Sequence, residues 1–166
     1  MQRIGDIELD QDLDFEYRQW RVQRAGWVVM VVIVVAALIG LFGTGPLSSS
    51  VAGSDDSVTV AYERFIRRQG EAELTIGIAG GQATEGQVEL WLDAAYHGEI
   101  QIQQISPEPE EVRSSGDRVT YVFAVDDPAA PVEISIQFMS PDMGRLQGEV
   151  GIGDQPGVSF TQFSYP

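Results

Sequence analysis

The stretch VEISIQF, Val132–Phe138, alternates apolar and polar side chains residue by residue. Successive side chains of an extended strand point to opposite faces, so the apolar residues would share one face and Glu133, Ser135 and Gln137 the other. A period of two over seven residues predicts a β-strand with one face in a core and the other in water.

The same alternation recurs seven more times between Val58 and Phe163, and Gly, Pro, Asp and Ser clusters separate the segments. The segments are VTVAY (58–62), ELTIGIA (73–79), VELWL (88–92), EIQIQQI (99–105), RVTYVFAV (118–125), RLQGEVGI (145–152) and VSFTQF (158–163). No helical period is found in this region. Eight such strands predict an all-β fold, an antiparallel β-sandwich over 58–166 of immunoglobulin-like or jelly-roll type. The strand order is not readable from the pattern.

An apolar run precedes the sandwich, and no ionisable side chain occurs from Ala25 to Ser54. A membrane-spanning helix needs about 20 apolar residues, so we predict a single transmembrane helix over 27–47. Trp20 and Trp27 lie where interfacial tryptophans are expected.

The charges that flank the run predict its orientation. Arg18, Arg21 and Arg24 precede it, and the first charges after it are Asp55 and Asp56. The positive-inside rule then places the N-terminus in the cytoplasm and the sandwich outside. The chain has no lysine and no asparagine, which is typical of a G/C-rich bacterial genome. We therefore expect a single-pass protein of the bacterial cytoplasmic (inner) membrane.

A cleavable signal peptide is the alternative to this anchor. SVAG (50–53) offers a small-x-small site that ends at Ala52. The apolar run is longer than the 7–15 residues, roughly, of a signal h-region, and the site lies ten residues beyond Phe42. We therefore interpret the run as a retained signal anchor.

Segment 1–26 is predicted to form a cytoplasmic amphipathic helix, with Leu9, Leu13 and Trp20 close to one face. Two interpretations are open: a helix that docks on a partner, or a membrane-surface helix whose arginines meet anionic headgroups. The small-xxx-small pair of Ala36 and Gly40 could support oligomerisation through the transmembrane helix. Segment 48–57 is expected to be a linker because small residues dominate it.

Composition excludes several classes of function. The 166 residues carry a formal charge of −15, which disfavours nucleic acid as a partner. No cysteine is present, so the chain has no disulfide, thiolate metal site or cysteine nucleophile. All ten basic residues are arginine, and a phosphate-binding loop that needs lysine is impossible.

No constellation of catalytic residues is evident. His97 is the only histidine and is expected in a surface loop, and no serine lies in a G-x-S-x-G elbow. Acid pairs occur without the spacing of a calcium loop; they are Asp55–Asp56, Glu110–Glu111 and Asp126–Asp127. We therefore predict a non-enzymatic protein with no catalytic residue, no cofactor and no metal site.

The stretch YERFIRRQG (62–70) gathers Arg64, Arg67 and Arg68 in an acidic domain. With Tyr62, these arginines are candidates for contact with lipid headgroups or with an acidic patch on a partner. The alternative is neutralisation of Asp and Glu on adjacent strands. Trp91 points away from Leu90 and Leu92 by strand parity, so it is either an exposed contact residue or lies under a loop.

The layout resembles a group of bacterial single-pass membrane proteins to which no activity is assigned. The resembling residues are WRVQRAGW (20–27), GPLS (45–48), YERFIR (62–67) and FTQFSYP (160–166). The resemblance implies the same topology, an N-terminal anchor followed by an extracytoplasmic β-sandwich, and implies no catalytic residue.

The leading hypothesis is a membrane-anchored, non-catalytic extracytoplasmic interaction module. Its partners would be the bilayer and another membrane or periplasmic protein, for which it would act as an accessory or stabilising subunit. The alternative is a sandwich that binds glycan or calcium at end loops, namely YHGE (96–99) and SPEPEEV (106–112).

Overall fold

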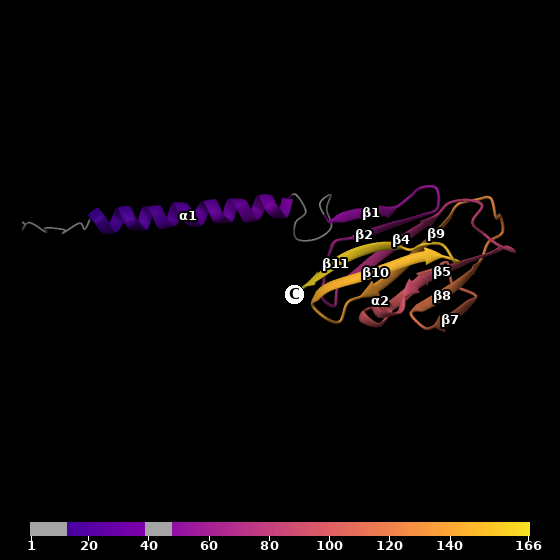
Figure 1. Ribbon diagram of the computed structural model, residues 1–166. Helices are drawn as coiled ribbons and strands as arrows, with labels where there is room; N and C mark the ends of the chain where they lie inside the picture. The colour runs from indigo at the N-terminus through magenta and orange to yellow at the C-terminus, as the bar shows by residue number, and fades with distance from the viewer. Residues whose placement is uncertain (1–12, 39–47) are drawn as a thin grey trace, which may run out of the picture. The chain divides into compact units, whose positions relative to one another are not determined.

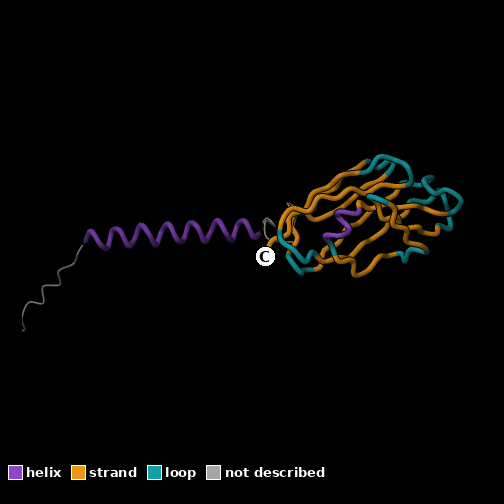
Figure 2. The backbone as a smooth tube through the Cα atoms, turned by 60° about the horizontal axis from the view of Figure 1, so that its bottom comes forward, coloured by secondary structure: helices purple, strands orange, loops and turns teal. Residues whose placement is uncertain are grey.

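In the computed structural model of the chain, residues 13–38 and 48–166 are described, with side chains from Gln19 onward. The chain divides into two compact units, Met1–Leu38 and Ile39–Pro166. Figures 1 and 2 show the elements of both units.

The described residues of the first unit form the helix α1 (Leu13–Leu38). Its segment Gln19–Leu38 has 20 residues and a mean hydropathy of 1.7, which makes it long and apolar enough to cross a membrane. The helix runs without a break from the predicted cytoplasmic segment into the predicted transmembrane segment. Leu9, Gly40 and the end of the predicted span at 39–47 lie outside the described residues.

The second unit is a β-sandwich of two sheets, which confirms the predicted fold class. Sheet A has the spatial order β1 (Ser49–Gly53), β2 (Val58–Glu63), β4 (Glu71–Ile78), β9 (Val132–Met139), β6 (Gln101–Ser106). Sheet B has the order β3 (Phe65–Arg67), β11 (Val158–Tyr165), β10 (Gly144–Ile152), β5 (Gln87–Asp93), β8 (Arg118–Ala124), β7 (Glu111–Ser115). All neighbouring strands are antiparallel except the parallel pair β3 and β11. Figure 2 shows that strands make up the second unit apart from short loops and one short helix.

The core lies between the sheets and contains the inward-facing residues of the alternating segments, together with Ile66, Ala72 and Tyr96, which were not predicted. The eight alternating segments correspond to β2, β4, β5, β6, β8, β9, β10 and β11. Ile134 and Ile136 of β9 are fully buried, and they pack with the alternate residues of the neighbouring strands. Burial of this apolar surface is the main force that holds the two sheets together.

Three strands were not predicted because their sequences lack an alternating apolar pattern. β1 lies within the predicted linker 48–57, where pairing with β2 gives small residues an extended structure. β3 has only three residues and is formed by pairing with β11. All five side chains of β7 are exposed, so none of them had to be apolar.

The prediction of a region without helices was wrong at α2 (Ala94–Glu99). Six residues are too few to show a helical period, and the helix begins because the Asp93 side chain accepts a hydrogen bond from the Tyr96 backbone N–H at 3.4 Å. His97 therefore lies in a helix and not in a surface loop. YHGE is not an open loop either, since it belongs to α2 and its first residue, Tyr96, is fully buried.

Tyr96 anchors α2 in the core through a buried polar contact. Its hydroxyl donates a hydrogen bond to Gln162 Oε1 at 2.6 Å, and Gln162 Nε2 donates to the Glu63 carbonyl at 2.9 Å. Burial and then the Glu99 carboxylate raise the pKa of Tyr96, so the phenol stays protonated and remains a donor. Because Gln162 is also fully buried, this pair satisfies polar groups that would otherwise be costly.

Gly148 of β10 lies where the Tyr96 and Phe160 rings meet. The two ring centroids are 5.0 Å apart in an edge-to-face arrangement. A β-carbon at position 148 would lie 2.5 Å from Phe160 Cζ and 2.9 Å from Tyr96 Cγ. Glycine is therefore required here by the close approach of two rings.

The carboxyl group of Glu63 makes stability depend on pH. Burial, and secondly the Glu73 carboxylate, raise the pKa of Glu63 above its ordinary value of 4.5. Above the raised pKa, Glu63 is ionised in the folded protein, where the charge is unfavourable, and this lowers the stability of the fold. Below 4.5 the group is protonated in both the folded and the unfolded chain, so this loss of stability is absent. We expect Glu63→Gln to raise the denaturant midpoint slightly at about pH 8, with the gain disappearing as the pH falls to about 4.5.

Glu71→Gln is the matched control for this prediction, because Glu71 is an exposed residue of β4 and its replacement removes the same charge. An equal gain from both variants at every pH would mean that only net charge matters, and would contradict the assignment to Glu63.

Candidate functional site

The predicted membrane-interface residues lie along the exposed surface of α1. Trp20 and Trp27 are more than half exposed, and the Arg24 guanidinium lies 4.0 Å from the centroid of the Trp20 ring. The spacing of four residues places this pair on one helix face. Arg21 is exposed, and the side chain of Arg18 lies outside the described residues. A role of these residues at the membrane stays a prediction.

The arginines of YERFIRRQG are not neutralised by neighbouring carboxylates. All three are exposed, and within residues 48–166 none of them forms a salt bridge. Arg64 donates a hydrogen bond to Ser50 Oγ at 3.2 Å, and Arg68 Nε donates to the Pro141 carbonyl at 2.9 Å. The structure therefore does not show the neutralisation that was the alternative interpretation, and a contact role for them stays a prediction.

The topology places two exposed phenylalanines beside these arginines. Phe65 of β3 is opposite Phe163 of β11, and Phe163 is opposite Arg145 of β10. Directly opposite residues in a sheet share a face, so these three side chains form a row on the outer face of sheet B. In the next row Arg67 is opposite Tyr165. Met143, just before β10, is 56% exposed at the same end.

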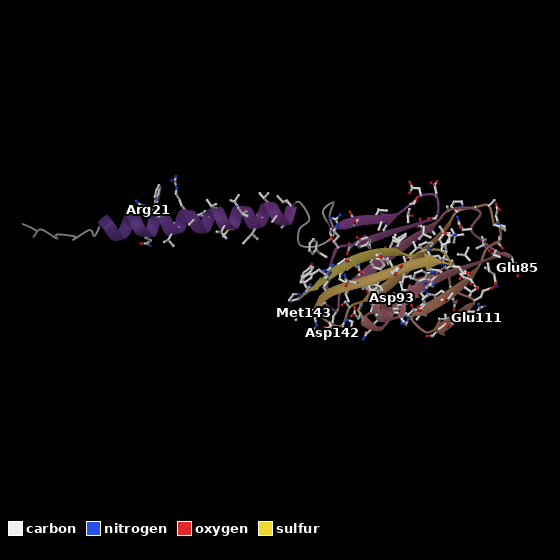
Figure 3. All side chains as sticks on the ribbon, viewed as in Figure 1. Arg21, Glu85, Asp93, Glu111, Asp142 and Met143 are labelled. Carbon is white, nitrogen blue, oxygen red and sulfur yellow. The ribbon has the colours of Figure 1, made fainter. Side chains whose placement is uncertain are left out.

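We call this surface the aromatic–arginine face; it consists of Phe65, Arg67, Met143, Arg145 and Phe163. Figure 3 labels Met143 at one end of the sandwich and Glu85 at the other. Of this set, only Arg67 is among the contact residues predicted from the sequence. Isolated phenylalanines in alternating strands gave no signal, because their adjacency depends on the pairing of β3 with β11.

Tyr62 and Trp91, two other predicted contact residues, face different surroundings. Tyr62 is half-buried and packs on the core, with its ring centroid 5.3 Å from that of Phe160. Trp91 does point away from the core, as parity predicted, but only 3% of it is exposed. An exposed contact surface at Trp91 is therefore not what the structure shows.

Trp91 is covered on the outer face of sheet B. The Arg118 guanidinium lies 3.9 Å from the ring centroid, and Gly151 and Gly157 provide the space that the ring fills. A β-carbon at position 151 would lie 2.6 Å from Trp91 Cζ2, and one at position 157 would also overlap the ring. Within the described part of the chain, the Trp91 Nε1 has no hydrogen-bond partner.

His97 and the acid pairs do not converge on a metal site. Among the residues whose placement is described, no group of three or more His, Asp or Glu side chains could hold a metal ion. His97 is half-buried, and its ring centroid lies 6.4 Å from that of Tyr121. No described contact gives it a nucleophile or an acidic partner.

A hollow of about 390 Å³ lies at the end of the sandwich near Glu85. Polar residues of three segments line it, without any aromatic side chain; the lining is Gln82, Thr84, Glu85, Gln87, Glu89, Ile152, Gly153, Asp154 and Gln155. Sugar sites normally present an apolar or aromatic platform together with polar groups. The glycan or calcium alternative therefore stays a prediction that no geometry favours.

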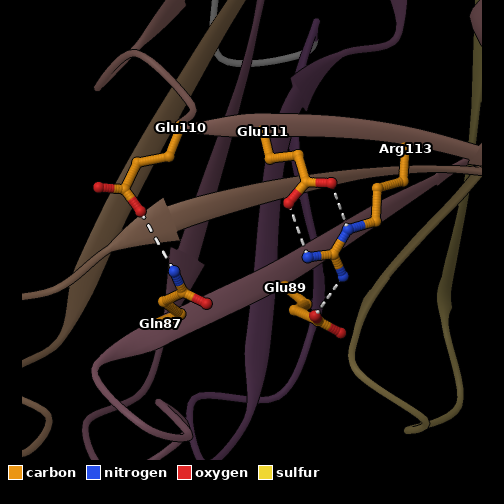
Figure 4. Close-up of polar contacts among 5 residues, drawn as sticks. All are labelled: Gln87, Glu89, Glu110, Glu111 and Arg113. Atoms are coloured by element: carbon orange, nitrogen blue, oxygen red, sulfur yellow. Dashed lines mark hydrogen bonds and ion pairs between the residues drawn. The ribbon is translucent and has the colours of Figure 1, made fainter.

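The four edge strands of the sandwich differ in charge. The edge strand β7 of sheet B contains charged side chains. Arg113 forms ion pairs with Glu111 at 2.8 Å and with Glu89 at 3.0 Å, and the Gln87 side-chain amide donates a hydrogen bond to the Glu110 carboxylate (Figure 4). These contacts lower the pKa of Glu111 through its hydrogen bond to Arg113. The other edge, β3, has three residues and includes Arg67. Charged edges discourage pairing with another strand.

The edges of sheet A, β1 and β6, contain no charged residue. β6, with the sequence QIQQIS, is the longest of the four edge strands, at six residues. Gln101, Gln103 and Gln104 are exposed, whereas Ile102 and Ile105 pack against the core. A hollow of about 600 Å³ lies along this strand and continues to Pro109. β6 pairs with β9 on one side, so its other side leaves backbone groups open to pairing.

No family model matches the chain, and no curated protein sequence matches it. Among solved structures, the chain is similar to a cohesin module of a family 33 glycoside hydrolase from Clostridium perfringens ATCC13124. The TM-score is 0.42 and the sequence identity 14%, covering 69% of this chain and 97% of that chain. A likeness this distant assigns neither topology nor function to the chain.

Proposed function

We propose that the chain is a membrane-tethered, non-catalytic interaction module that acts as an accessory or stabilising subunit of a membrane protein complex. In this proposal α1 is a retained anchor in the bacterial inner membrane, with the N-terminus cytoplasmic and the sandwich extracytoplasmic. The apolar segment Gln19–Leu38 supports the anchor, and the charge order around it supports the orientation.

The observation that carries the proposal is the uncharged, open edge of β6. Proteins usually protect an exposed edge with charge, proline or a bulge, because an open edge pairs with other strands. β6 has only one of these protections, a bulge at Gln103, and no charge or proline between Gln101 and Ser106. An extended segment of a partner protein could add to sheet A there, with backbone hydrogen bonds for affinity and the neighbouring hollow for side chains.

Site-directed crosslinking tests this assignment, and the absence of native cysteine makes single-cysteine variants of the full-length protein unambiguous. A benzophenone attached to the cysteine of the Gln103→Cys variant is expected to crosslink to one discrete partner protein in membranes of the cells that produce the chain. The matched control is Ser114→Cys on β7, which is also an exposed edge position. Capture of the same proteins from both positions would contradict the proposal.

A charge placed on the β6 edge should block the interaction. We expect Gln104→Lys, in the Gln103→Cys background, to lower the crosslinked yield about fivefold or more, because a desolvated lysine opposes strand addition. Ser114→Lys introduces the same charge at β7 and should leave the yield unchanged. Equal yields from the two lysine variants would remove β6 as the docking edge.

A further inference from the structure

We infer that the aromatic–arginine face (Phe65, Arg67, Met143, Arg145 and Phe163) docks the sandwich onto the anionic phospholipid surface of the membrane that holds α1. The inference rests on the proposed membrane anchor and is independent of the partner at β6. It assigns the outer face of β3, β11 and β10 to the lipid surface and leaves the edge of sheet A free.

The distribution of charge in the second unit points to this face. From Ser48 onward the chain contains 19 acidic residues and six arginines. Two of the arginines are engaged elsewhere: Arg113 in ion pairs, and Arg118 over the Trp91 ring. The other four lie on β3, directly beside it in the sequence, or in the same row as Phe65; they are Arg64, Arg67, Arg68 and Arg145. A strongly acidic domain would be repelled by anionic lipid in any other orientation.

Arg67 and Arg145 have exposed side chains. Within the described residues 48–166, neither guanidinium forms a hydrogen bond or a salt bridge, and both are exposed. Asp142 and Glu99 lie nearby, since they line a small hollow together with Met143 and Arg145. Neither carboxylate comes within ion-pair distance of Arg145.

Apolar side chains accompany the arginines in the arrangement that membrane-surface proteins use. Phe65 is 37% exposed and Phe163 is 47% exposed, at directly opposite positions of β3 and β11. Phenylalanine at the boundary of headgroups and acyl chains gains from burial, while adjacent arginines meet phosphate groups.

The described part of the second unit begins beside this face. Ser48 binds the beginning of β3: its carbonyl accepts from the Arg64 N–H at 2.7 Å, and its hydroxyl donates to the Phe65 carbonyl at 3.4 Å. Ser48 follows the last described residue of α1, Leu38, by ten positions. Ten residues span about 35 Å at most, so this corner is the part of the sandwich tied most closely to the anchor in sequence.

The test uses full-length single-cysteine variants in nanodiscs, where both membrane faces are accessible. An environment-sensitive fluorophore is attached at Met143→Cys or, as the control, at Val112→Cys, which is similarly exposed on β7. With about 30% phosphatidylglycerol we expect the Met143 probe to shift to shorter wavelength and to be quenched by headgroup nitroxide lipids at least about twofold more than the Val112 probe. High salt should reduce the difference.

The arginines are tested with the same Met143 probe. Arg67→Gln combined with Arg145→Gln is expected to lower the docking equilibrium constant about tenfold or more in the anionic nanodiscs. Arg113→Gln removes a comparable charge from β7 and should leave docking nearly unchanged. Phe65→Ser with Phe163→Ser should also reduce quenching, because the apolar contact is lost.

Three results would overturn the inference. A Met143 probe as accessible as the Val112 probe in anionic nanodiscs would show that this face does not dock on lipid. If the Met143 probe showed the same spectral shift and quenching in nanodiscs of pure phosphatidylcholine as in anionic nanodiscs, the arginines would have no role in docking. Protection only in native membranes, together with crosslinking to a protein, would reassign the face to a protein partner. Because the purified system contains no partner, failure here leaves the Gln103 crosslinking result unaffected.

Discussion

Tyr96→Ala is expected to lower the free energy of unfolding by about 3–5 kcal/mol, the range observed when a buried aromatic is truncated. Tyr96 is fully buried and contacts the Phe138 and Phe160 rings edge-on. The substitution creates a cavity and also leaves the fully buried Gln162 Oε1 without its donor. Because a domain is stable by only about 5–15 kcal/mol, this single change should bring the sandwich close to unfolding. Denaturant titration of the full-length protein in detergent measures it.

Tyr96→Phe separates the polar part of this loss from the cavity. It keeps the ring and removes only the hydroxyl, so we expect a loss of about 1–3 kcal/mol from the unsatisfied Gln162. Phe163→Ala is the matched control, since it truncates an aromatic ring that is about half exposed on the outer face. Its cost should be well below that of Tyr96→Ala. Equal losses for these two variants would contradict the assignment of Tyr96 to the core.

Gly148→Ala is expected to destabilise the protein by about 1–3 kcal/mol, the usual cost of overpacking a well-filled core. The added methyl group would lie closer than 3.0 Å to both Phe160 Cζ and Tyr96 Cγ. The two rings pack against each other, so neither can retreat without losing its contact with the other. Thermal unfolding followed by near-ultraviolet circular dichroism would report the loss.

Gly98→Ala is the matched control for Gly148→Ala, because a β-carbon at position 98 in α2 would meet no atom within 4 Å. Alanine is favoured over glycine in a helix, so this variant should be neutral or slightly more stable. A second test is Phe160→Leu in the Gly148→Ala background, which should recover part of the loss if the ring causes the clash. No recovery, together with an equal effect of Gly98→Ala, would show that backbone entropy and not crowding decides the cost.

The alternating segments made the layers and the core predictable, because burial of one sheet face leaves a direct trace in the sequence. Ile134 and Ile136 were assigned to the inside from period alone and are fully buried. The direction in which Trp91 points was also predictable. The burial of Trp91 was not predictable, because the ring is covered by Arg118 and fits into space left by Gly151 and Gly157.

The remaining features depend on contacts between distant residues. Phe65 and Phe163 are 98 positions apart in the sequence, and only the pairing of β3 with β11 makes them neighbours. Parity in VSFTQF places Gln162 on the inner face with Val158 and Phe160, but its hydrogen bond to Tyr96 joins residues 66 positions apart and could not be predicted. α2 was missed because its N-cap Asp93 begins a helix too short to show a period.

The aromatic–arginine face depends on β11, the last strand of the sandwich to be synthesised. β11 lies between β10 and β3, and β3 is translated about 90 residues before it. Until β11 has been synthesised, β3 has no partner in its sheet and Phe65 has no aromatic neighbour. Strand pairings between such distant segments are slow to form. The aromatic–arginine face therefore cannot form before β11 is available, and a chain truncated before Val158 would not display it.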